Sequence, residues 1–319
     1  MNKEIKVTEL KREYDAGFVP SQEYLDSMPD IQNSPYQSLY PIERVGIHGF
    51  HMPMFIYQKN LGEQEVMASI TGMVSLEANK AGINMSRIIR TAYNSLGDRL
   101  SVSRLCQVLS DYKKDLQTFD AHIIIKFPYR IWQQALRSVS DKGTLEGGWQ
   151  YYDVTFDINL DREGNFRKQM ILDFVYSSAC PCSTELSNHA ALERGVYGIP
   201  HSQRSVARIA VEFDEIVWIE DLVKTMQDAL KTEVLVFCKR QDEQAYAELN
   251  GANVKFVEDA IRLISHELNQ LPEVLDFKVI CSHLESLHAH DAIAVITKGL
   301  PESKYTPEVS FDELQAMKR

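Results

Sequence analysis

The order of its strand-like and helical segments is the feature that most constrains the fold of this chain. From residue 42 onward, two strand-like segments precede two helical ones and two more strands, and the second half repeats that order. Separate runs of strands and helices predict an α+β protein with antiparallel sheets. The predicted strands cover 44–57, 67–76, 121–128, 149–160, 166–178, 205–213, 276–282 and 292–297, and the predicted helices cover 85–96, 102–116, 219–230 and 255–268.

Four regions follow from this pattern. Residues 1–40 are polar, contain several prolines and show little periodicity, which predicts an extended N-terminal arm. Residues 41–160 hold the first copy of the strand–helix–strand order. Residues 161–300 hold the second copy and are expected to carry most of the site residues. Residues 301–319 are a C-terminal tail.

Charge and composition exclude several classes of protein. The chain has 34 basic and 45 acidic residues and a net charge of −11, whereas sequence-independent binding of nucleic acid needs a basic surface. Any anionic ligand must therefore be bound by a local cluster of Lys and Arg. The charged start lacks the apolar region of a signal peptide, and no apolar stretch is long enough to span a membrane. Five sparse cysteines predict reduced thiols and a cytoplasmic location.

Residues that could carry chemistry gather between positions 177 and 290. Cys180 and Cys182 flank a proline at the end of a predicted strand, and they are either small buried residues or a ligand or nucleophile. His201 follows a proline in a loop before a strand, where it is either structural or able to bind a metal. The charged run 239–244, which includes Glu243, is either a solvated helix start or part of a site.

Two further segments offer a carboxylate and a pair of imidazoles. Glu258 borders the apolar face of a predicted helix, where its alternative role is an ion pair with Arg262 worth about 0.3–0.5 kcal/mol. In an extended segment, His288 and His290 would lie on one face. They could be ligands, an acid and base pair near neutral pH, or residues of a wet strand end. Together, a thiolate, imidazoles and carboxylates are the ingredients of an open catalytic metal site.

Several short segments, in a fixed order over most of the chain, make the indication of a catalytic metal site more specific. In them the sequence resembles the type IB GTP cyclohydrolase family. The matching segments are M-P-D-I-Q-N-S (28–34), R-V-G-I (44–47), G-I-N-M-S-R (82–87), S-S-A-C-P-C-S (177–183), P-H-S-Q-R-S (200–205), K-R-Q-D-E-Q (239–244), N-G-A-N (250–253), F-V-E-D-A (256–260) and L-E-S-L-H-A-H-D-A (284–292).

The resemblance implies both a fold and a reaction. The fold is the tunnelling fold (T-fold), with two ββααββ modules per subunit and antiparallel sheets. The subunits would assemble into a barrel-like homo-oligomer, expected to be a tetramer, with active sites at the interfaces. The reaction is hydrolysis of C–N bonds in the guanine imidazole ring of GTP, which gives 7,8-dihydroneopterin triphosphate and formate. It is the first step of tetrahydrofolate biosynthesis and involves neither nucleic acid nor membrane.

Position by position, the resemblance also implies roles. One divalent metal per site is expected, zinc or manganese, with iron as a further candidate. The implied metal ligands are Cys180, His201 and Glu243, the guanine-binding carboxylate is Glu258, and the catalytic residues are Cys180, His288 and His290. Candidate cations for the triphosphate are Arg204, Lys239, Arg240 and Arg87.

The sequence departs from the family pattern at two positions. Asn84 stands where a histidine is expected before Met-Ser-Arg, which puts the substrate contact of that loop in doubt, and Gln241 stands where glutamate is usual. One alternative function is another T-fold activity, an NADPH-dependent nitrile reductase, but its E-S-K-x-x-K-like segment is missing. Another is a non-catalytic metal-binding protein. An assay for neopterin formation from GTP separates the three.

Overall fold

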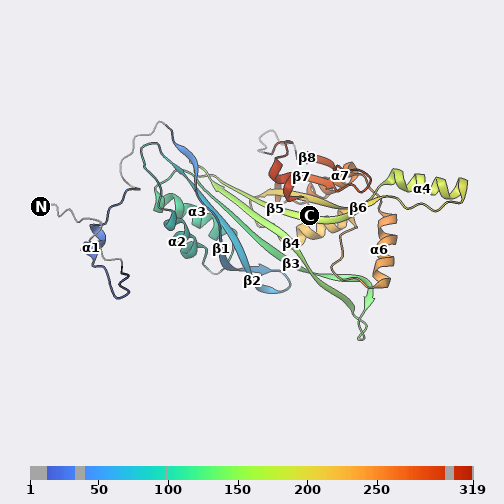
Figure 1. The fold of residues 1–319 in the computed structure, drawn as a ribbon, viewed down its shortest axis with the longest axis horizontal. Helices are drawn as coiled ribbons and strands as arrows, with labels where there is room; N and C mark the ends of the chain where they lie inside the picture. Colours follow the sequence, from blue (N-terminus) through green and yellow to red (C-terminus); the bar gives the residue numbers. More distant parts are fainter. Residues whose placement is uncertain (1–12, 33–39, 98, 299–304, 318–319) are drawn as a thin grey trace.

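The computed structural model describes residues 13–32, 40–97, 99–298 and 305–317. Its centre is one sheet in which eight strands follow their order in the chain, each antiparallel to its neighbours (Figure 1). The strands are β1 (Ile42–Gln58), β2 (Gly62–Leu76), β3 (Ala121–Val139), β4 (Leu145–Leu160), β5 (Phe166–Ala179), β6 (Ser202–Phe213), β7 (Val274–His283) and β8 (Ala292–Thr297).

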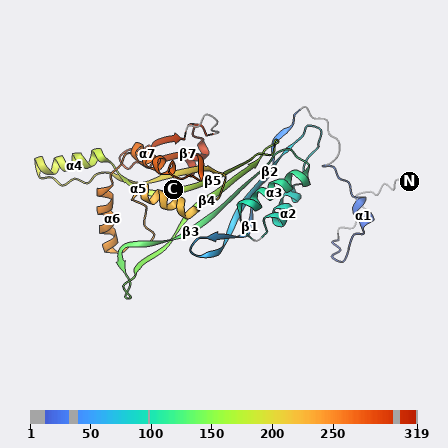
Figure 2. The same ribbon diagram turned by 180° about the vertical axis from the view of Figure 1, so that it is seen from behind.

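Among the described residues, three of the connections between strands contain helices. Two helices, α2 (Met85–Leu96) and α3 (Val102–Leu116), lie between β2 and β3. The helix α4 (Pro181–Arg194) joins β5 to β6 and projects beyond the sheet (Figures 1 and 2). Three more lie between β6 and β7: α5 (Ile219–Leu230), α6 (Arg240–Ala252) and α7 (Val257–Leu268). Short helices α1 (Gln22–Asp26) and α8 (Phe311–Ala316) belong to the N-terminal arm and the C-terminal tail.

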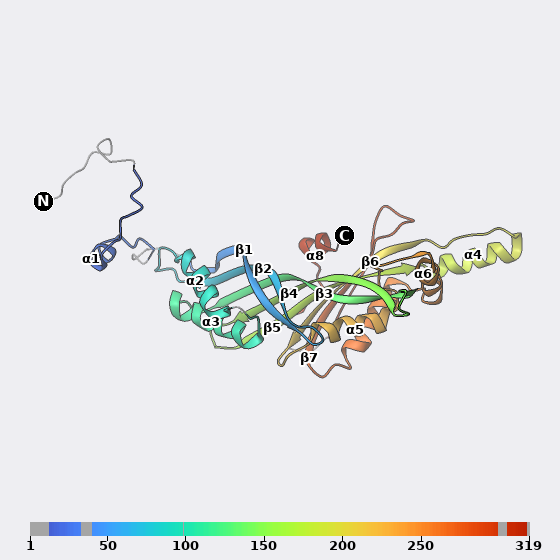
Figure 3. The ribbon, with the colours of Figure 1, turned by 90° about the horizontal axis from the view of Figure 1, so that it is seen from below.

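Alternating side chains place the main core on one face of the sheet. In β3, Ile123, Ile125, Phe127 and Tyr129 are buried because a strand sends every second side chain to the same side. The apolar stripes of α2, α3, α5 and α7 pack against that face. The tail lies on the opposite face (Figure 3), where Met317 packs against Val206 and Ile280.

The structure corrects the expectation of a T-fold built from two ββααββ modules. All eight strands form one continuous sheet, and β4 pairs directly with β5 through the register Leu160↔Phe166. The second half also differs in its helices, since α4 separates β5 from β6 and three helices, not two, precede β7. These additions have no apolar stripe to reveal them, because α4 buries no residue and α6 buries only Asp242 and Ala245. The division into the four sequence regions stays a prediction.

The bounds of the strongly periodic elements are confirmed. The predicted segments 85–96, 102–116, 219–230 and 292–297 coincide with α2, α3, α5 and β8. The predicted strand 121–128 is too short, because β3 continues past Pro128 to Val139 through residues whose apolar alternation is weaker. No helix of the described residues is long and apolar enough to cross a bilayer.

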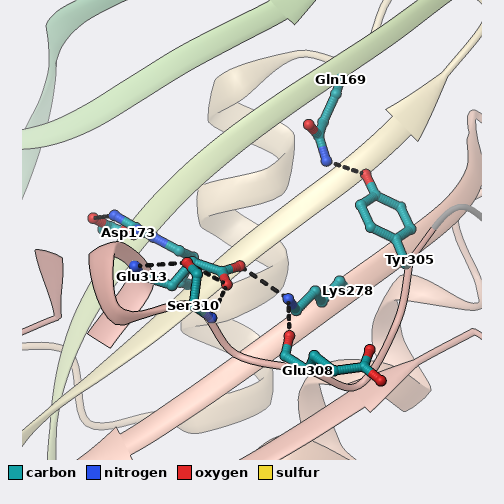
Figure 4. A network of polar contacts seen from close by, with 8 residues as sticks. Gln169, Asp173, Lys278, Tyr305, Glu308, Ser310 and Glu313 are labelled. Atoms are coloured by element: carbon teal, nitrogen blue, oxygen red, sulfur yellow. Dashed lines mark hydrogen bonds and ion pairs between the residues drawn. The ribbon is translucent and has the colours of Figure 1, made fainter. Parts of the chain in front are cut away.

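The C-terminal tail is fixed to the sheet by polar contacts (Figure 4). Lys278 of β7 donates through Nζ to the carbonyl oxygen of Glu308, 2.7 Å away, and lies 3.0 Å from Oε1 of Glu313. Gln169 of β5 donates to the Tyr305 hydroxyl at 2.6 Å. These contacts hold the tail across β5 and β7, so the part of the predicted tail at 305–317 is ordered against the sheet.

Candidate functional site

Cys180 and His201 lie side by side where β5 ends and β6 begins. These strand ends are paired through Ala179↔Ser202. The backbone N–H of Cys180 donates to the carbonyl oxygen of His201, 3.2 Å away. Cys180 is also the N-cap residue of α4, and Pro181 at the first helical position suits that start because its fixed φ matches the helix. The sulfur of Cys180 therefore sits at the positive end of a helix, which favours a negative charge there.

The His201 ring faces two polar side chains. Its Nδ1 lies 3.2 Å from Oε1 of Gln203 and 3.4 Å from Oε2 of Glu285. That Glu285 oxygen is buried and makes no hydrogen bond within the described residues, and it lies within ion-pair distance of the histidine ring. Sequence reasoning did not single out Glu285, although it lies in the segment 284–292. Only the fold brings it to His201.

A buried polar network continues beneath this pair. Gln203 donates through Nε2 to the Ser178 hydroxyl at 2.8 Å, and that hydroxyl lies 3.2 Å from Nδ1 of His283. The other nitrogen of His283 lies 3.0 Å from the Tyr176 hydroxyl. Burial, with a smaller effect from the charge of Lys255, lowers the pKa of His283 to about 4. At neutral pH this histidine is therefore uncharged and serves as a hydrogen-bonding group of the strand ends.

Glu258 is brought to the same end of the sheet by the connection between α6 and α7. The backbone N–H of Lys255 donates to the carbonyl oxygen of Ala179, 3.1 Å away. Glu258 then lies exposed in the first turn of α7. Its alternative role was an ion pair with Arg262, but Arg262 lies 3.8 Å from Asp259 instead. Glu258 is therefore solvent-exposed in a helix that begins just after Lys255, which contacts the residue before Cys180.

Glu243, the third implied metal ligand, lies elsewhere in the chain. It is exposed in the first turn of α6, whereas the other end of that helix leads to Lys255 and the strand ends. The ten residues from Glu243 to Asn253 span about 15 Å of helix. Within the described residues, no three His, Cys, Asp or Glu side chains lie close enough to hold a metal ion. The donor types suit a divalent metal, but one chain does not assemble Cys180, His201 and Glu243 into a site.

His288 and His290 lie in the loop between β7 and β8. The segment is not a strand, yet the two rings stack face to face, with centroids 4.8 Å apart and planes 8° from parallel. Both side chains are exposed. The loop begins beside the site, because the N–H of Leu284 donates to the carbonyl oxygen of Arg204, 3.2 Å away. Two imidazoles are thus presented together near the ends of β6 and β7.

The candidate cations are scattered. Lys239 is paired with Glu146 at 2.6 Å. Arg87 donates to the carbonyl oxygen of Asp115 at 2.7 Å in the α2–α3 pair, which lies toward the opposite end of the molecule from α4 (Figure 2). Arg204 and Arg240 are exposed, the first of them in β6 close to His201. Of the four candidate cations, Arg204 is the one placed in β6, three residues after His201.

The structure locates Asn84 and Gln241, the two residues that depart from the family pattern. Asn84 is the N-cap residue of α2, and its side-chain oxygen accepts a hydrogen bond from the Arg87 N–H at 3.2 Å. Asn is among the best residues for that position, which accounts for its presence in structural terms. Gln241 is exposed in the first turn of α6, where no hydrogen bond or ion pair to another described residue explains it.

Comparison with known proteins identifies the family. The family model described as type I GTP cyclohydrolase folE2 matches residues 28–294. The GTP cyclohydrolase FolE2 of Cereibacter sphaeroides (strain KD131) is 46% identical over 297 residues, which cover 91% of this chain and 81% of that protein. The GTP cyclohydrolase FolE2 of Paracoccus denitrificans (strain Pd 1222) is 45% identical over 295 residues, 91% of this chain and 90% of the relative.

Similarity to solved structures is weaker. A uricase from Arthrobacter globiformis aligns with a TM-score of 0.49 and 8% identity, and the alignment covers 83% of this chain and 96% of the uricase. A likeness at that level carries no argument about activity. The sequence matches decide the assignment, because the family model spans most of the chain and includes Cys180, His201, Glu243, Glu258 and both loop histidines. The chain belongs to the type I GTP cyclohydrolase FolE2 family.

Proposed function

We propose that this protein hydrolyses the imidazole ring of GTP, giving 7,8-dihydroneopterin triphosphate and formate as the first step of tetrahydrofolate biosynthesis. The observation that carries the proposal is the family match over residues 28–294. Every residue to which a role in the reaction is given below lies within that range. The finer designation as a type IB enzyme, and a cytoplasmic location, belong to the same proposal. The matching family itself bears the name FolE2.

Glu258 is proposed to recognise guanine. Guanine presents an N1–H and an exocyclic amino group side by side, two donors that match the two oxygens of one carboxylate. The exposed position of Glu258 at the first turn of α7, with Arg262 turned to Asp259, leaves its carboxylate available for such a ligand. Each charge-assisted hydrogen bond contributes roughly 1.5–3 kcal/mol.

His288 and His290 are proposed to move protons during ring opening. Attack of water on C8 of guanine needs a proton delivered to the ring nitrogen as the C–N bond breaks. Stacked imidazoles at an exposed loop are suited to that transfer near neutral pH. Arg204, next to the Cys180 and His201 pair, is the best placed of the candidate cations for the triphosphate.

A divalent metal, zinc or manganese with iron as a further candidate, would supply Lewis acidity and a coordinated water of lowered pKa. Cys180 and His201 provide a thiolate and an imidazole from adjacent strand ends. We infer that Glu243 reaches this pair from a neighbouring subunit, because α6 holds it about 15 Å from the connection to α7 in its own chain. The site would then be completed in a homo-oligomer, for which a tetramer is proposed.

Mixing inactive variants tests the shared site. Cys180→Ala and Glu243→Gln chains, each inactive alone, are unfolded, mixed and refolded together. If the ligands come from different subunits, up to about a quarter of the wild-type activity returns, since random assembly creates some sites with both wild-type ligands. If they come from the same subunit, the mixture stays inactive and the shared-site inference fails.

The activity itself is tested by incubating the purified, metal-loaded protein with GTP. Neopterin is measured by fluorescence after oxidation, and formate is measured separately in equal amount. Formation of both from GTP, without consumption of NADPH, is expected. Oxidation of NADPH would instead indicate a nitrile reductase, and metal binding without turnover would indicate a non-catalytic protein.

A further inference from the structure

A cavity lies on the helix-bearing face of the sheet, between the N-terminal ends of α3 and α5. Its volume is about 280 Å³. Its walls are mainly apolar and partly aromatic, and they come from β1, β3, β4, β6 and the segments at the starts of α3 and α5. The aromatic residues that line it are Tyr57, Phe127, Tyr129, Phe156, Phe213 and Trp218.

This cavity is separate from the proposed GTP site. Phe213 is the last residue of β6, whereas Ser202, beside His201, is the first. Eleven residues of extended strand separate them by about 36 Å. None of the residues proposed to bind metal, guanine or triphosphate lines the cavity. It therefore needs an explanation of its own.

Two buried polar groups face each other in this apolar cavity, the Tyr129 hydroxyl and the Glu220 carboxylate. The Tyr129 side chain is 1% exposed. In Glu220, Oε1 accepts from the backbone N–H of Lys59 at 2.8 Å, but Oε2 is buried and has no hydrogen bond from any described residue. A buried carboxylate oxygen without a hydrogen-bond donor destabilises the folded protein. Oε2 of Glu220 thus marks a place where a donor from a ligand would be stabilised.

The two groups also lie close together. Burial raises the pKa of Tyr129, and the neighbouring Glu220 carboxylate raises it further, so the phenol stays protonated. The cations at the rim are already paired, Lys59 with Asp221 and Arg99 with Glu63. Among the residues that line the cavity, the carboxylate is that of Glu220. A complementary ligand carries a flat apolar body and a positively charged donor.

We propose that this cavity binds a small aromatic amine. The ring of the ligand lies between the aromatic side chains, and its ammonium group donates to Glu220 beside the Tyr129 hydroxyl. Edge-to-face or offset contacts with aromatic side chains stabilise a bound ring beyond the burial of its area. The charge-assisted hydrogen bond to Glu220 supplies the preference for an amine over a neutral or acidic analogue. The proposal does not depend on the GTP reaction.

Three probes that share an indole ring test it: tryptamine, the neutral 3-methylindole and the anionic indole-3-acetate. Binding to the full-length protein is measured by calorimetry, with and without saturating GTP. We expect saturable binding of tryptamine that GTP does not displace, at least tenfold weaker binding of 3-methylindole and no binding of indole-3-acetate. Equal binding of all three probes, no binding of tryptamine, or its displacement by GTP would each overturn the proposal.

Variants locate the site. Glu220→Gln keeps the shape and should weaken tryptamine at least tenfold, and Tyr129→Phe should weaken it severalfold. Glu215→Gln is the matched control, since it removes the same charge from an exposed residue nearby that does not line the cavity. Thermal unfolding verifies that each variant is folded. If Glu220→Gln and Tyr129→Phe are folded and bind tryptamine as well as the control does, the cavity is not the binding site.

Discussion

Gln203 presents its side-chain oxygen to Nδ1 of His201 at 3.2 Å while its amide nitrogen donates to the Ser178 hydroxyl at 2.8 Å. An amide fixed at one end can hold the imidazole at the other in one orientation and one tautomer. With Nδ1–H donated to Gln203, Nε2 of His201 is left available as a ligand.

The first prediction concerns this orientation. Gln203→Leu should weaken metal binding by about 10–100-fold, the usual effect of losing such a supporting group. Metal affinity is measured by titration with a chelator, and kcat is then compared at saturating metal. Gln134→Leu, at an exposed position of β3, is the control and should change neither quantity. Unchanged metal affinity in the folded Gln203→Leu protein would show that Gln203 is only structural.

Cys180 and Cys182 should behave differently. Cys180 lies beside His201, whereas Cys182 is exposed and is the second residue of α4. We expect Cys180→Ala to lose both metal and turnover, and Cys182→Ala to keep appreciable metal because the proposed ligand is the Cys180 thiolate. Elemental analysis of the purified proteins decides the point. Full metal occupancy in Cys180→Ala would remove Cys180 from the ligand set.

The stacked histidines should affect turnover and not metal. His288→Ala and His290→Ala should fold normally and lower kcat by about 10²–10⁴-fold, the range for a general acid or base. Metal content is measured on the same samples. His189→Ala, which removes an exposed histidine of α4, serves as the control. Release of metal from either loop variant would show that its histidine is a ligand.

Glu258 gives the sharpest test of substrate identity. Glu258→Gln keeps the shape but removes the charge and one acceptor, so GTP turnover should fall by orders of magnitude while the metal stays bound. The wild-type protein should also reject ATP, since adenine lacks the paired donors of guanine. Glu273→Gln, at an exposed position before β7, is the control. Near wild-type kinetics of Glu258→Gln on GTP would show that Glu258 is a surface residue that does not bind guanine.

The buried His283 should make stability depend on pH. Its pKa lies near 4 in the folded protein because of burial, against an ordinary value of 6.5. The unfolded chain therefore binds a proton first as the pH falls. Above about pH 6.5 the free energy of unfolding is unaffected by this titration. It decreases progressively from there toward pH 4, by up to about 3 kcal/mol. Urea unfolding from pH 8 to 4 should show a smaller loss in His283→Gln than in wild type, with His266→Gln as the exposed control. Parallel curves for His283→Gln and wild type would contradict this.

The sequence predicts those parts of the fold and site that leave a local pattern. The stripe Leu105, Val108, Leu109, Tyr112 and Leu116 places α3 because its apolar spacing is complete. The same reasoning misses α4, whose side chains are not buried. The prediction of a GTP cyclohydrolase family is confirmed, since ordered motifs survive divergence, whereas the two-module T-fold is wrong because strand pairing between halves leaves no local signal.

The site residues show the same limit. The pairing of Cys180 with His201 depends on the register of β5 and β6, and Glu285 reaches His201 only through the β6–β7 pair. Neither relation can be read from spacing along the chain. The implied ligand set, the metal and the oligomer stay predictions.

The order of the strands also bears on how the protein is made. Because each strand pairs with the one before it in the chain, the sheet can grow in the order in which the ribosome releases it. The hairpins of β1–β4, with α2 and α3 packed on them, can form before Cys180 has been synthesised. At about 5–20 residues per second, β5 to β8 follow over roughly 7–26 seconds. During that interval the free edge of β4 is open to pairing with another nascent chain.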